Sequence, residues 1–384
     1  MTTLKVLSRI AEVPQAAWDA LVGDGSPFLE WSWLAALEES GTVGRRTGWQ
    51  PCHLSLWEGG ALIGACPLYV KSHSMGEFVF DQNWAAAAAR AGIQYYPKLL
   101  VGVPFTPVTG ARFLTLPSAG RAPSVERLAA GLEALCEQQD LSSIHVNFCL
   151  PDEVEVLEGR GWLRRTGWQY HWTNTGFTTF DDYLASLRSK RRNQVRRERR
   201  ALADDGVEIT AHTGDEISKS LMERMFTLYR TTLEGLTWGQ QYLNLAFFRL
   251  AYERLRPRLC MIVARQGGEP IAGTFNVVKG GIFYGRYWGT VKSIRYLHFN
   301  VCYYAAIEYC VRNGLARFEP GAGGDFKLLR GFDAAATESM HLVRNRRLAD
   351  AVGSYLRDER RAVESEIEWL GERTARKRGA SDEP

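Results

Sequence analysis

A lysine, two carboxylates and a histidine lie in one segment of the sequence, residues 283–332. This segment includes FYGRYWG at 283–289 and RFEPGAGGDFKLLRGF at 317–332, in which glycines separate charged and aromatic residues. Glycines allow the backbone to approach a ligand closely. Lys327, Asp325, Glu319 and His298 carry side chains that move protons or stabilise negative charge. This combination predicts an active site within residues 283–332.

These residue types suit the transfer of an acyl group to an amine. The reaction needs a neutral amine, a carbonyl beside it, and a positive group directed at the oxygen that becomes negative. We expect Lys327 to be the positive group. Asp325, Glu319 or His298 would take the proton of the amine, directly or through water, and the sequence leaves this choice open. The structural alternatives are a solvated lysine, a surface strand end and a histidine that caps a helix.

Further polar and aromatic residues are predicted to bind the substrate. Arg286 and Trp288 alternate along an expected strand, so they would share one face and clamp an anionic or aromatic group, unless Trp288 is a core residue. In the first half, KSHSMGEFVFD and YYPK suit substrate recognition or a loop held by hydrogen bonds. The predicted substrate-binding residues are Arg286, Tyr287, Trp288, Phe326, Arg330, Lys71, His73, Glu77, Asp81, Tyr95, Tyr96 and Lys98.

A basic stretch follows the middle of the chain. Residues 188–200, RSKRRNQVRRERR, contain eight basic residues and one acid. The stretch is either the solvated face of a helix or a contact for the phosphate of RNA, a nucleotide or coenzyme A. Arg191, Arg192 and Arg196 are the predicted contacts.

Composition and missing motifs exclude several classes of protein. The chain has 384 residues, 45% hydrophobic and 23% charged, which is typical of a globular protein with two domains. Its seven cysteines are scattered, so we expect no disulfide framework and no metal site. The sequence contains no run of about 18 apolar residues, which a membrane-spanning helix would need. The scattered cysteines favour a cytoplasmic protein. The motifs GxSxG, GxxxxGK and strand-linked GxGxxG are absent.

Two segments repeat one pattern. GGALIGACPLYVK at 59–71 and GGEPIAGTFNVVK at 267–279 share residues at identical spacing, and both predict β-hairpins. Around each we expect the order helix, hairpin, strand, helix, strand. The repeat predicts duplicated domains, residues 1–165 and 166–384, with the boundary near 166–180 before a basic helix opened by Asp181 and Asp182. One more helix is expected after Leu356, followed by ten disordered residues.

The layout resembles the FemAB-like family of N-acyltransferases, which are related to the Fem-type aminoacyltransferases of peptidoglycan synthesis. The resemblance rests on FLEWSWLAALEESG, QYHWTN, FDDYLASLRSKRRNQVRRER, FYGRYWG, HFNVCYY and KLLRGF, among other strings. It implies an α+β fold of two tandem GNAT-like acyltransferase domains, with mixed central sheets flanked by helices. It also implies that Lys327, after Phe326, stabilises the oxyanion. The chain departs from the family in reading GAGGDFK where GAQGEHK is usual, and in Asn300 where an acid is usual.

The sequence therefore predicts an N-acyltransferase or aminoacyltransferase with its catalytic half in residues 166–384. Its first half would help to build the substrate cleft. The donor would be an acyl-CoA or an aminoacyl-tRNA, used as a co-substrate without a tightly bound cofactor. The acceptor would be an amine of a small metabolite or a cell-wall precursor. The alternatives are a non-catalytic protein that recognises a peptidoglycan-like ligand and an RNA-binding protein that uses residues 188–200.

Overall fold

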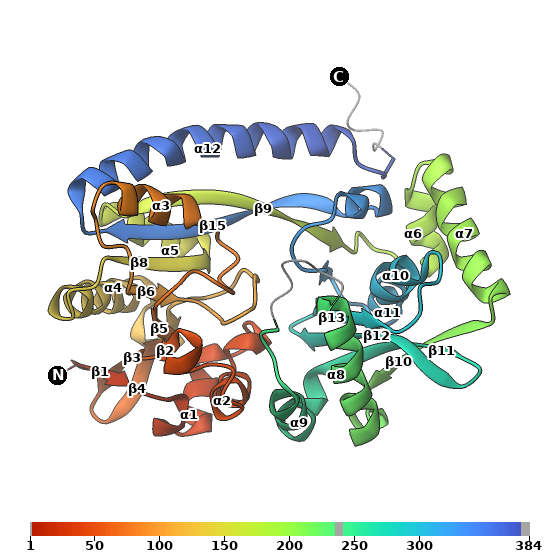
Figure 1. Ribbon diagram of the computed structural model, residues 1–384, viewed down its shortest axis with the longest axis horizontal. Helices are drawn as coiled ribbons and strands as arrows, with labels where there is room; N and C mark the ends of the chain where they lie inside the picture. The colour runs from red at the N-terminus through yellow and green to blue at the C-terminus, as the bar shows by residue number, and fades with distance from the viewer. Residues whose placement is uncertain (1, 235–240, 378–384) are drawn as a thin grey trace. The chain divides into compact units, whose positions relative to one another are not determined.

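The computed structural model describes residues 2–234 and 241–377, which divide into two compact units (Figure 1). Unit 1 comprises Met1–Gly167 and Ala336–Ser365, and unit 2 comprises Trp168–Ala335 and Glu366–Pro384. This division differs from the predicted domains in residues 336–365, which were expected in the second domain. They pack with unit 1 because residues 338–343 pair with a strand of unit 1 and Met340 lies in its core.

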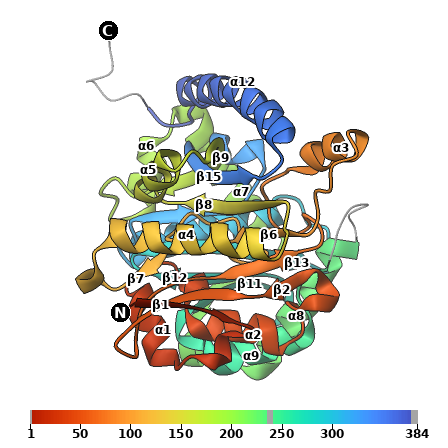
Figure 2. The same cartoon turned by 90° about the vertical axis from the view of Figure 1, so that its left-hand side faces the viewer.

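Unit 1 contains two sheets. Its elements are β1 (Thr2–Leu7), α1 (Gln15–Val22), α2 (Trp31–Glu39), β2 (Trp49–Pro51), β3 (His53–Glu58), β4 (Ala61–Cys66), β5 (Leu68–Lys71), α3 (Gln82–Arg90), β6 (Lys98–Val101), β7 (Leu114–Thr115), α4 (Arg121–Gln138), β8 (Ser143–Cys149) and α5 (Pro151–Gly159). The strands order as β1-β3-β4-β7 and as β15-β8-β6-β5-β2, in which only β6 and β8 are parallel. Helix α4 packs against β3, β4 and β8 (Figure 2).

Unit 2 contains one mixed sheet. Its elements are α6 (Phe180–Ser186), α7 (Ser189–Asp204), β10 (Val207–Thr213), α8 (Lys219–Glu234), α9 (Leu245–Arg254), β11 (Leu259–Gln266), β12 (Glu269–Lys279), β13 (Ile282–Thr290), α10 (Leu297–Phe299), the π-helical turn η7 (Asn300–Tyr304), α11 (Ala305–Arg312), β14 (Arg317–Glu319) and the 3-10 helix η8 (Asp325–Arg330). The order is β10-β11-β12-β13-β14-β9, and only β13 and β14 are parallel. The strands β9 (Leu163–Thr173) and β15 (Asp333–Val343) and the helix α12 (Arg346–Glu372) contribute residues to both units.

The predicted repeat is confirmed in the connectivity of the strands. Both hairpins, β3–β4 and β11–β12, turn through two glycines with positive φ, at 59–60 and 267–268. Two residues with positive φ match the twist of a tight hairpin, and glycine adopts them without strain. Both first strands also have a register shift near their ends, at Leu56/Trp57 and Ala264/Arg265. In unit 2 the antiparallel β13 pairs with the hairpin, and the parallel β14 follows α11. In unit 1 the antiparallel pair β5–β6 and the parallel β8, which follows α4, lie in a different sheet from the hairpin.

The predicted helices are present, and two of them differ in where they begin, the first being the helix of the basic stretch. Asp181 and Asp182 lie in the first turn of the separate helix α6, which begins at Phe180 and in which Thr179 and Asp182 form a capping box. The basic helix is α7, which starts only at Ser189. It buries Val195, Glu198 and Leu202 on one face, as expected from their helical spacing.

The C-terminal helix predicted after Leu356 exists but begins earlier, as α12 at Arg346. Of the ten residues predicted to be disordered, 378–384 lie outside the described residues. The described ones are ordered by contacts. Ala375 is buried, and the amide of Lys377 donates to the carbonyl of Ser186.

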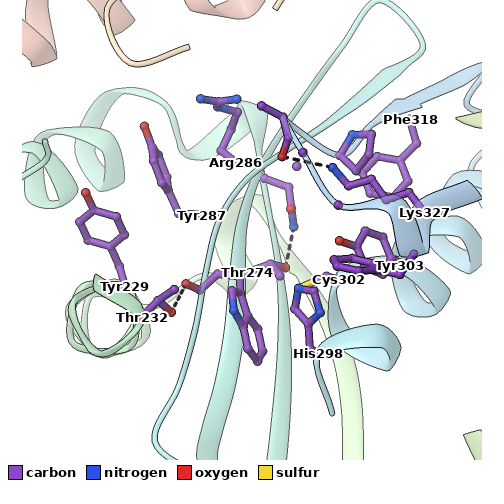
Figure 3. A pocket seen from close by; sticks show the side chains of 18 of the residues that line it. Tyr229, Thr232, Thr274, Arg286, Tyr287, His298, Cys302, Tyr303, Phe318 and Lys327 are labelled. Atoms are coloured by element: carbon purple, nitrogen blue, oxygen red, sulfur yellow. Dashed lines mark hydrogen bonds between the residues drawn. The ribbon is translucent and has the colours of Figure 1, made fainter. Parts of the chain in front are cut away.

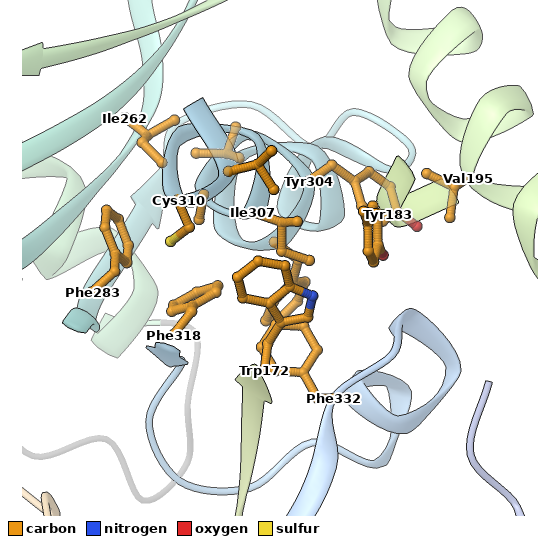
Figure 4. Packing of buried hydrophobic residues seen from close by; sticks show 14 of the residues in the cluster. Trp172, Tyr183, Val195, Ile262, Phe283, Tyr304, Ile307, Cys310, Phe318 and Phe332 are labelled. Atoms are coloured by element: carbon orange, nitrogen blue, oxygen red, sulfur yellow. The ribbon is translucent and has the colours of Figure 1, made fainter. Parts of the chain in front are cut away.

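The core of unit 2 holds the elements that carry the predicted active site. Trp172 of β9, Phe283 of β13, Ile307 of α11 and Phe318 of β14 pack together with Phe332, which follows η8 (Figure 4). Buried aromatic side chains of this size contribute much of the free energy of folding. The ends of β13 and β14 and the helix η8 therefore sit on a rigid base. The prediction of an α+β protein with mixed sheets flanked by helices is confirmed.

Candidate active site

A cavity of about 630 Å³ opens in unit 2 where β13 and β14 separate (Figure 3). These two strands pair over only three residues each, 282–284 with 317–319. Beyond them β13 continues to Thr290, whereas β14 ends at Glu319, and the next residue, Pro320, lacks an amide proton for further pairing. At the point of separation, a Cβ on Gly285 would lie 3.3 Å from Cα of Pro320. A larger residue at this position would press against Pro320 where the cavity begins.

A β-bulge shapes one wall of the cavity. In β13, Gly285 pairs with Asn276 and Tyr287 with Phe275, so Arg286 is an extra residue in the ladder. A bulge interrupts the alternation of side chains. Accordingly the guanidinium of Arg286 lies 5.6 Å from the centroid of the Tyr287 ring, whereas Trp288 contacts His298 instead. All three predicted residues of β13 line the cavity, but the expected pairing of Arg286 with Trp288 on one face is wrong.

Helix α8 closes the same wall. Its Thr232 hydroxyl donates to the carbonyl of Trp288 at 2.7 Å, and its Thr231 hydroxyl donates to the carbonyl of Thr290 at 2.8 Å. The helix comes so close that a Cβ on Gly289 would lie 1.6 Å from the carbonyl oxygen of Leu228. Tyr229 and Thr232 of this helix line the cavity. The sequence did not point to them, because an amphipathic helix gives no sign of which strand it touches.

Lys327 lies at the opposite side of the cavity, in η8. It is 2% exposed, and its Nζ donates to the carbonyl of Gly321 at 2.7 Å and to that of Ala322 at 3.4 Å. Burial lowers the pKa of Lys327 to about 8, because the charged ammonium loses its hydration. At pH 7 most Lys327 side chains remain charged. The glycine-rich loop thus holds a cation at the cavity through backbone carbonyls.

His298 lines the cavity among aromatic rings. It is the second residue of α10, which begins after Tyr296, so the prediction of a helix start is confirmed. Its ring lies 4.9 Å from Trp288 and 5.7 Å from Phe326, measured between centroids. Burial, assisted by the positive charges of Arg330 and Lys327, lowers the pKa of His298 to about 4. The imidazole is therefore neutral at pH 7 and able to accept a hydrogen bond or a proton.

The two predicted carboxylates do not line the cavity. Glu319 ends β14 as expected and is buried, with Oε1 2.9 Å from Nη2 of Arg317 and Oε2 4.0 Å from Nε2 of His171. Burial raises the pKa of Glu319 to about 7, although Arg317 and Arg286 oppose the change. Asp325, the first residue of η8, is exposed. Their roles as proton acceptors stay predictions, and only His298 among the three lies at the cavity wall.

Arg330 makes internal contacts instead of lining the cavity. Its Nη2 lies 3.0 Å from Oε2 of the buried Glu198, its Nε donates to the Tyr304 hydroxyl at 2.9 Å, and its Nη1 donates to the carbonyl of Phe326 at 2.9 Å. These bonds connect η8 with α7 and η7. Through these bonds Arg330 holds η8, which carries Lys327 and Phe326, against α7 and η7.

The arginines predicted to contact phosphate lie on α7. Arg191 and Arg192 are partly exposed and Arg196 is exposed. Arg191 donates to the Gln194 side chain at 3.0 Å, and Nη2 of Arg196 is 3.6 Å from Oδ1 of Asp181. Contact with phosphate stays a prediction for all three.

The predicted residues of the first half form a buried ionic network in unit 1. Nζ of Lys98 donates to Glu77 at 2.8 Å and to Asp81, and the Tyr95 hydroxyl donates to Asp81 at 2.6 Å. Nζ of Lys71 lies 3.8 Å from Oε1 of Glu77. Burial lowers the pKa of Lys71 and raises that of Glu77, each to about 7.

Two further residues of the first half lie at the edge of this network. The Tyr96 hydroxyl hydrogen-bonds Ser74 at 2.7 Å, and Nε2 of His73 hydrogen-bonds the carbonyl of Thr47 at 3.0 Å. These contacts fit the alternative of a loop held by hydrogen bonds. Substrate recognition by this set stays a prediction.

Several residues of the cavity were not singled out from the sequence, although most of them lie in the predicted segment 283–332. They come from β12, η7, β14 and the loop after it, and are Thr274, Asn276, Cys302, Tyr303, Phe318, Pro320, Ala322, Gly323 and Gly324. Among the described residues, no group of three or more His, Cys, Asp or Glu side chains could hold a metal ion. No described helix is long and apolar enough to cross a membrane.

Comparison with known proteins identifies the family. The FemAB-like family, described by the terms peptidoglycan biosynthesis and recognition, matches residues 9–378. The chain belongs to the FemAB-like family. The match spans both halves, including the cavity and the basic helix. No curated protein sequence matches the chain.

Solved structures show the same fold at low sequence identity. FemX is 12% identical with a TM-score of 0.56, and the match covers 89% of this chain and 98% of FemX. L-PGS from Bacillus licheniformis is 10% identical with a TM-score of 0.50, covering 85% of this chain and 95% of that one. A conserved protein from Bacteroides thetaiotaomicron is 12% identical with a TM-score of 0.51, and the match covers 89% of this chain and 100% of that one. The chain thus shares the fold of FemX and of these two proteins.

Proposed function

We propose that this protein is an N-acyltransferase that joins an activated acyl group to an amine, with the reaction in the cavity between β13 and η8. The observation that carries the proposal is the buried ammonium of Lys327 at the cavity wall, held by the carbonyls of Gly321 and Ala322. An ammonium has three N–H donors, and these two carbonyls accept two of them. The third is available to an oxyanion in the cavity.

The proposed reaction begins with attack of the amine nitrogen on the carbonyl carbon of the donor. Negative charge then develops on the carbonyl oxygen, and Lys327 stabilises it. When the C–N bond has formed, the C–S or C–O bond of the donor breaks, and the departing thiolate or alkoxide takes up the proton that the amine loses. One preorganised donor of this kind contributes on the order of 3 to 4 kcal/mol to transition-state stabilisation. The donor is an acyl thioester or an aminoacyl ester of tRNA. The acceptor is an amine of a small metabolite or, in line with the family, of a peptidoglycan precursor.

His298 supports the proton transfer in this proposal. It is neutral at pH 7 and lies in the cavity wall beside Trp288 and Phe326. The attacking nitrogen must lose a proton, and a neutral imidazole can receive it directly or through one water. Glu319 has a pKa of about 7, closer to the operating pH, and takes part only through an intervening group because it does not line the cavity.

The proposal is tested by a transfer assay with the purified full chain. Acyl-CoA thioesters of several lengths and a set of aminoacyl-tRNAs are supplied as donors, with a peptidoglycan precursor that carries a free amine and small diamines as acceptors. Amide products are detected by mass spectrometry. The matched variants are K327M and K292M, because Lys292 is an exposed lysine whose Nζ contacts Gln266 away from the cavity.

Amide formation by the wild type and K292M, with a loss in K327M, is the expected result. Saturable binding of a donor or precursor without any amide product would contradict the proposal and support a non-catalytic recognition protein. Binding of uncharged RNA that weakens steeply with salt, without transfer, would support the alternative role of the basic helix.

A further inference from the structure

The basic stretch on α7 contains a single acidic residue, and that residue faces inward. Glu198 is buried, whereas Arg196 and Arg197, which directly precede it, are exposed. Burial of a carboxylate is costly unless cationic or hydrogen-bonding groups surround it. The contacts of Glu198 therefore indicate what the buried face of the basic helix does.

The carboxylate of Glu198 contacts three elements. Nε2 of Gln194, one turn earlier in α7, donates to Oε1 at 2.8 Å. The hydroxyl of Tyr304 in η7 donates to Oε2, and Nη2 of Arg330 in η8 lies 3.0 Å from the same oxygen. Hydrogen bonds to an ionised group are shorter and roughly twice as strong as those between neutral groups. Glu198 therefore connects the basic helix firmly to η8.

The same network reaches the backbone of Lys327. Nη1 of Arg330 donates to the carbonyl of Phe326 at 2.9 Å, and this carbonyl belongs to the peptide bond between Phe326 and Lys327. The guanidinium also lies 3.5 Å from the centroid of the Phe299 ring. Arg330 is thus held by Glu198 on one side and holds the peptide group of Lys327 on the other.

The helix η8 depends on such an external contact. It is a 3-10 helix of six residues between Gly324 and Gly331, which have φ of 91° and 77°. Short 3-10 helices have poor hydrogen-bond geometry, and glycines at both ends restrict the backbone little. Lys327 must nevertheless place its Nζ within about 3 Å of a developing oxyanion. A displacement of about 1 Å can lower a reaction rate on the order of 100-fold.

Gln194 continues the network to the surface of α7. Nη1 of Arg191 donates to Oε1 of Gln194 at 3.0 Å, which leaves Nε2 of the same amide directed at Glu198. None of these three residues lines the cavity. The bonds therefore continue without interruption from the surface of the basic helix to the peptide group of Lys327.

We propose that Gln194 and Glu198 of the basic helix are positioning residues, which hold Lys327 at the cavity through Arg330. The inference rests on the proposed function, because it assigns both residues to the transfer that Lys327 would promote. The charge of Glu198 is essential to this role, since an uncharged amide would bind Arg330 more weakly. Because neither residue lines the cavity, their loss should lower kcat more than it raises KM.

The test compares E198Q and Q194A with the wild type and with E308Q, using the full chain. Glutamine has the size of glutamate without its charge, and alanine removes the Gln194 amide while it favours a helix. E308Q is the matched control, because Glu308 of α11 binds Arg199 of α7 at 2.7 Å in a partly exposed ion pair outside the network. Urea denaturation identifies conditions under which every variant is folded.

Two independent properties are measured. The first is kcat and KM for amide formation, across the pH range in which Lys327 titrates, with the donor and acceptor that the wild type uses best. The second is the titration of Lys327 itself, followed by NMR of the chain labelled with ¹³C at lysine Cε. K327M identifies the signal of this lysine. The second measurement needs no substrate.

We expect E198Q to lower kcat on the order of 100-fold and Q194A to lower it less, with KM nearly unchanged and E308Q like the wild type. The pKa of Lys327, about 8 in the wild type, should rise toward 10.5 in E198Q and Q194A, because a displaced η8 admits water to the ammonium. Wild-type kcat and an unchanged pKa of Lys327 in folded E198Q and Q194A would overturn the inference. A raised KM at unchanged kcat would overturn it as well.

The positioning role and the proposed function fail in different ways. If the wild type forms no amide with any donor, the proposed function fails, whereas a raised pKa of Lys327 in E198Q still shows that the network holds this lysine. If the wild type forms amide and both variants keep its kcat and its pKa of Lys327, N-acyl transfer stands and the positioning role is refuted.

Discussion

The replacement K327M is expected to reduce catalysis while it makes the protein more stable. Lys327 is 2% exposed, and its pKa falls from 10.5 to about 8 because burial disfavours its charge. This change corresponds to about 3 kcal/mol of unfavourable free energy for the charged form in the folded state. Methionine has a similar length and no charge, so it removes this cost. The carbonyls of Gly321 and Ala322 lose a donor, and we therefore expect a net gain of about 1 to 3 kcal/mol in the free energy of unfolding at pH 7.

The effect on turnover has the opposite sign. Without the ammonium, the oxyanion loses on the order of 3 to 4 kcal/mol of stabilisation, so kcat should fall roughly 100- to 1,000-fold. In the wild type, kcat should also decline as pH rises through about 8, because Lys327 then loses its proton. K327M should lack this decline. The assay follows the release of free thiol from the preferred donor across this pH range.

The free energies of unfolding of the wild type and of K327M should differ in their dependence on pH. Between about pH 8 and 10.5 the unfolded lysine holds a proton that the folded one has lost, so wild-type stability rises with pH over this window. Urea denaturation of K327M should not show this rise, and K292M should behave like the wild type. A K327M protein with unchanged kcat would refute the assigned role. Reduced stability at pH 7 would refute the reasoning about its buried charge.

Further substitutions test the packing and the buried charges around the site. G289A should lower the free energy of unfolding by roughly 3 kcal/mol, because its Cβ would collide with a backbone carbonyl of α8. G371A, in an open part of α12, should raise the free energy of unfolding by up to about 1 kcal/mol. Equal free energies of unfolding for the two variants in urea denaturation would contradict this reasoning. R330M should lower the free energy of unfolding by about 3 to 5 kcal/mol, because the buried carboxylate of Glu198 loses its cationic partner. The double variant E198Q/R330M should recover part of that loss in the same assay. Between pH 4.5 and 7 the raised pKa of Glu319 makes the free energy of unfolding of the wild type fall as pH increases. E319Q should flatten this dependence. An unchanged slope of the free energy of unfolding against pH would argue against the raised pKa.

Local features of the site followed from the sequence. The hairpin turns need residues with positive φ, and the paired glycines at 59–60 and 267–268 adopt it in both predicted turns. The spacing of apolar residues placed α2, α4, α8 and α11 on the chain. The glycines before Lys327 indicated a close approach of the backbone, and this lysine does lie at a cavity among aromatic residues. In each case the cause acts over a few residues, so a short segment of sequence contains it.

The predictions that differed from the structure concern pairing between distant segments. Alternation along β13 predicted Arg286 beside Trp288, but the bulge depends on the register with β12. Arg330 was expected at the substrate, but it bonds to Glu198, which lies 132 residues earlier in the chain. Residues 336–365 were expected with the second half, but their strand pairs with β8. None of these partners can be recognised from the residue itself.

The sequence by itself determined the family, the α+β class, the duplicated order of elements and the segment that carries Lys327. These properties depend on local conformation and on strings that are long enough to be specific. Only the tertiary structure decided which side chains meet. It placed Lys327, Arg286 and His298 around one cavity and left Glu319 and Asp325 outside its wall. Burial lowered the pKa values of Lys327 and His298 and raised that of Glu319. The chemical environment of a group depends on every segment packed around it, and a linear pattern does not contain that information.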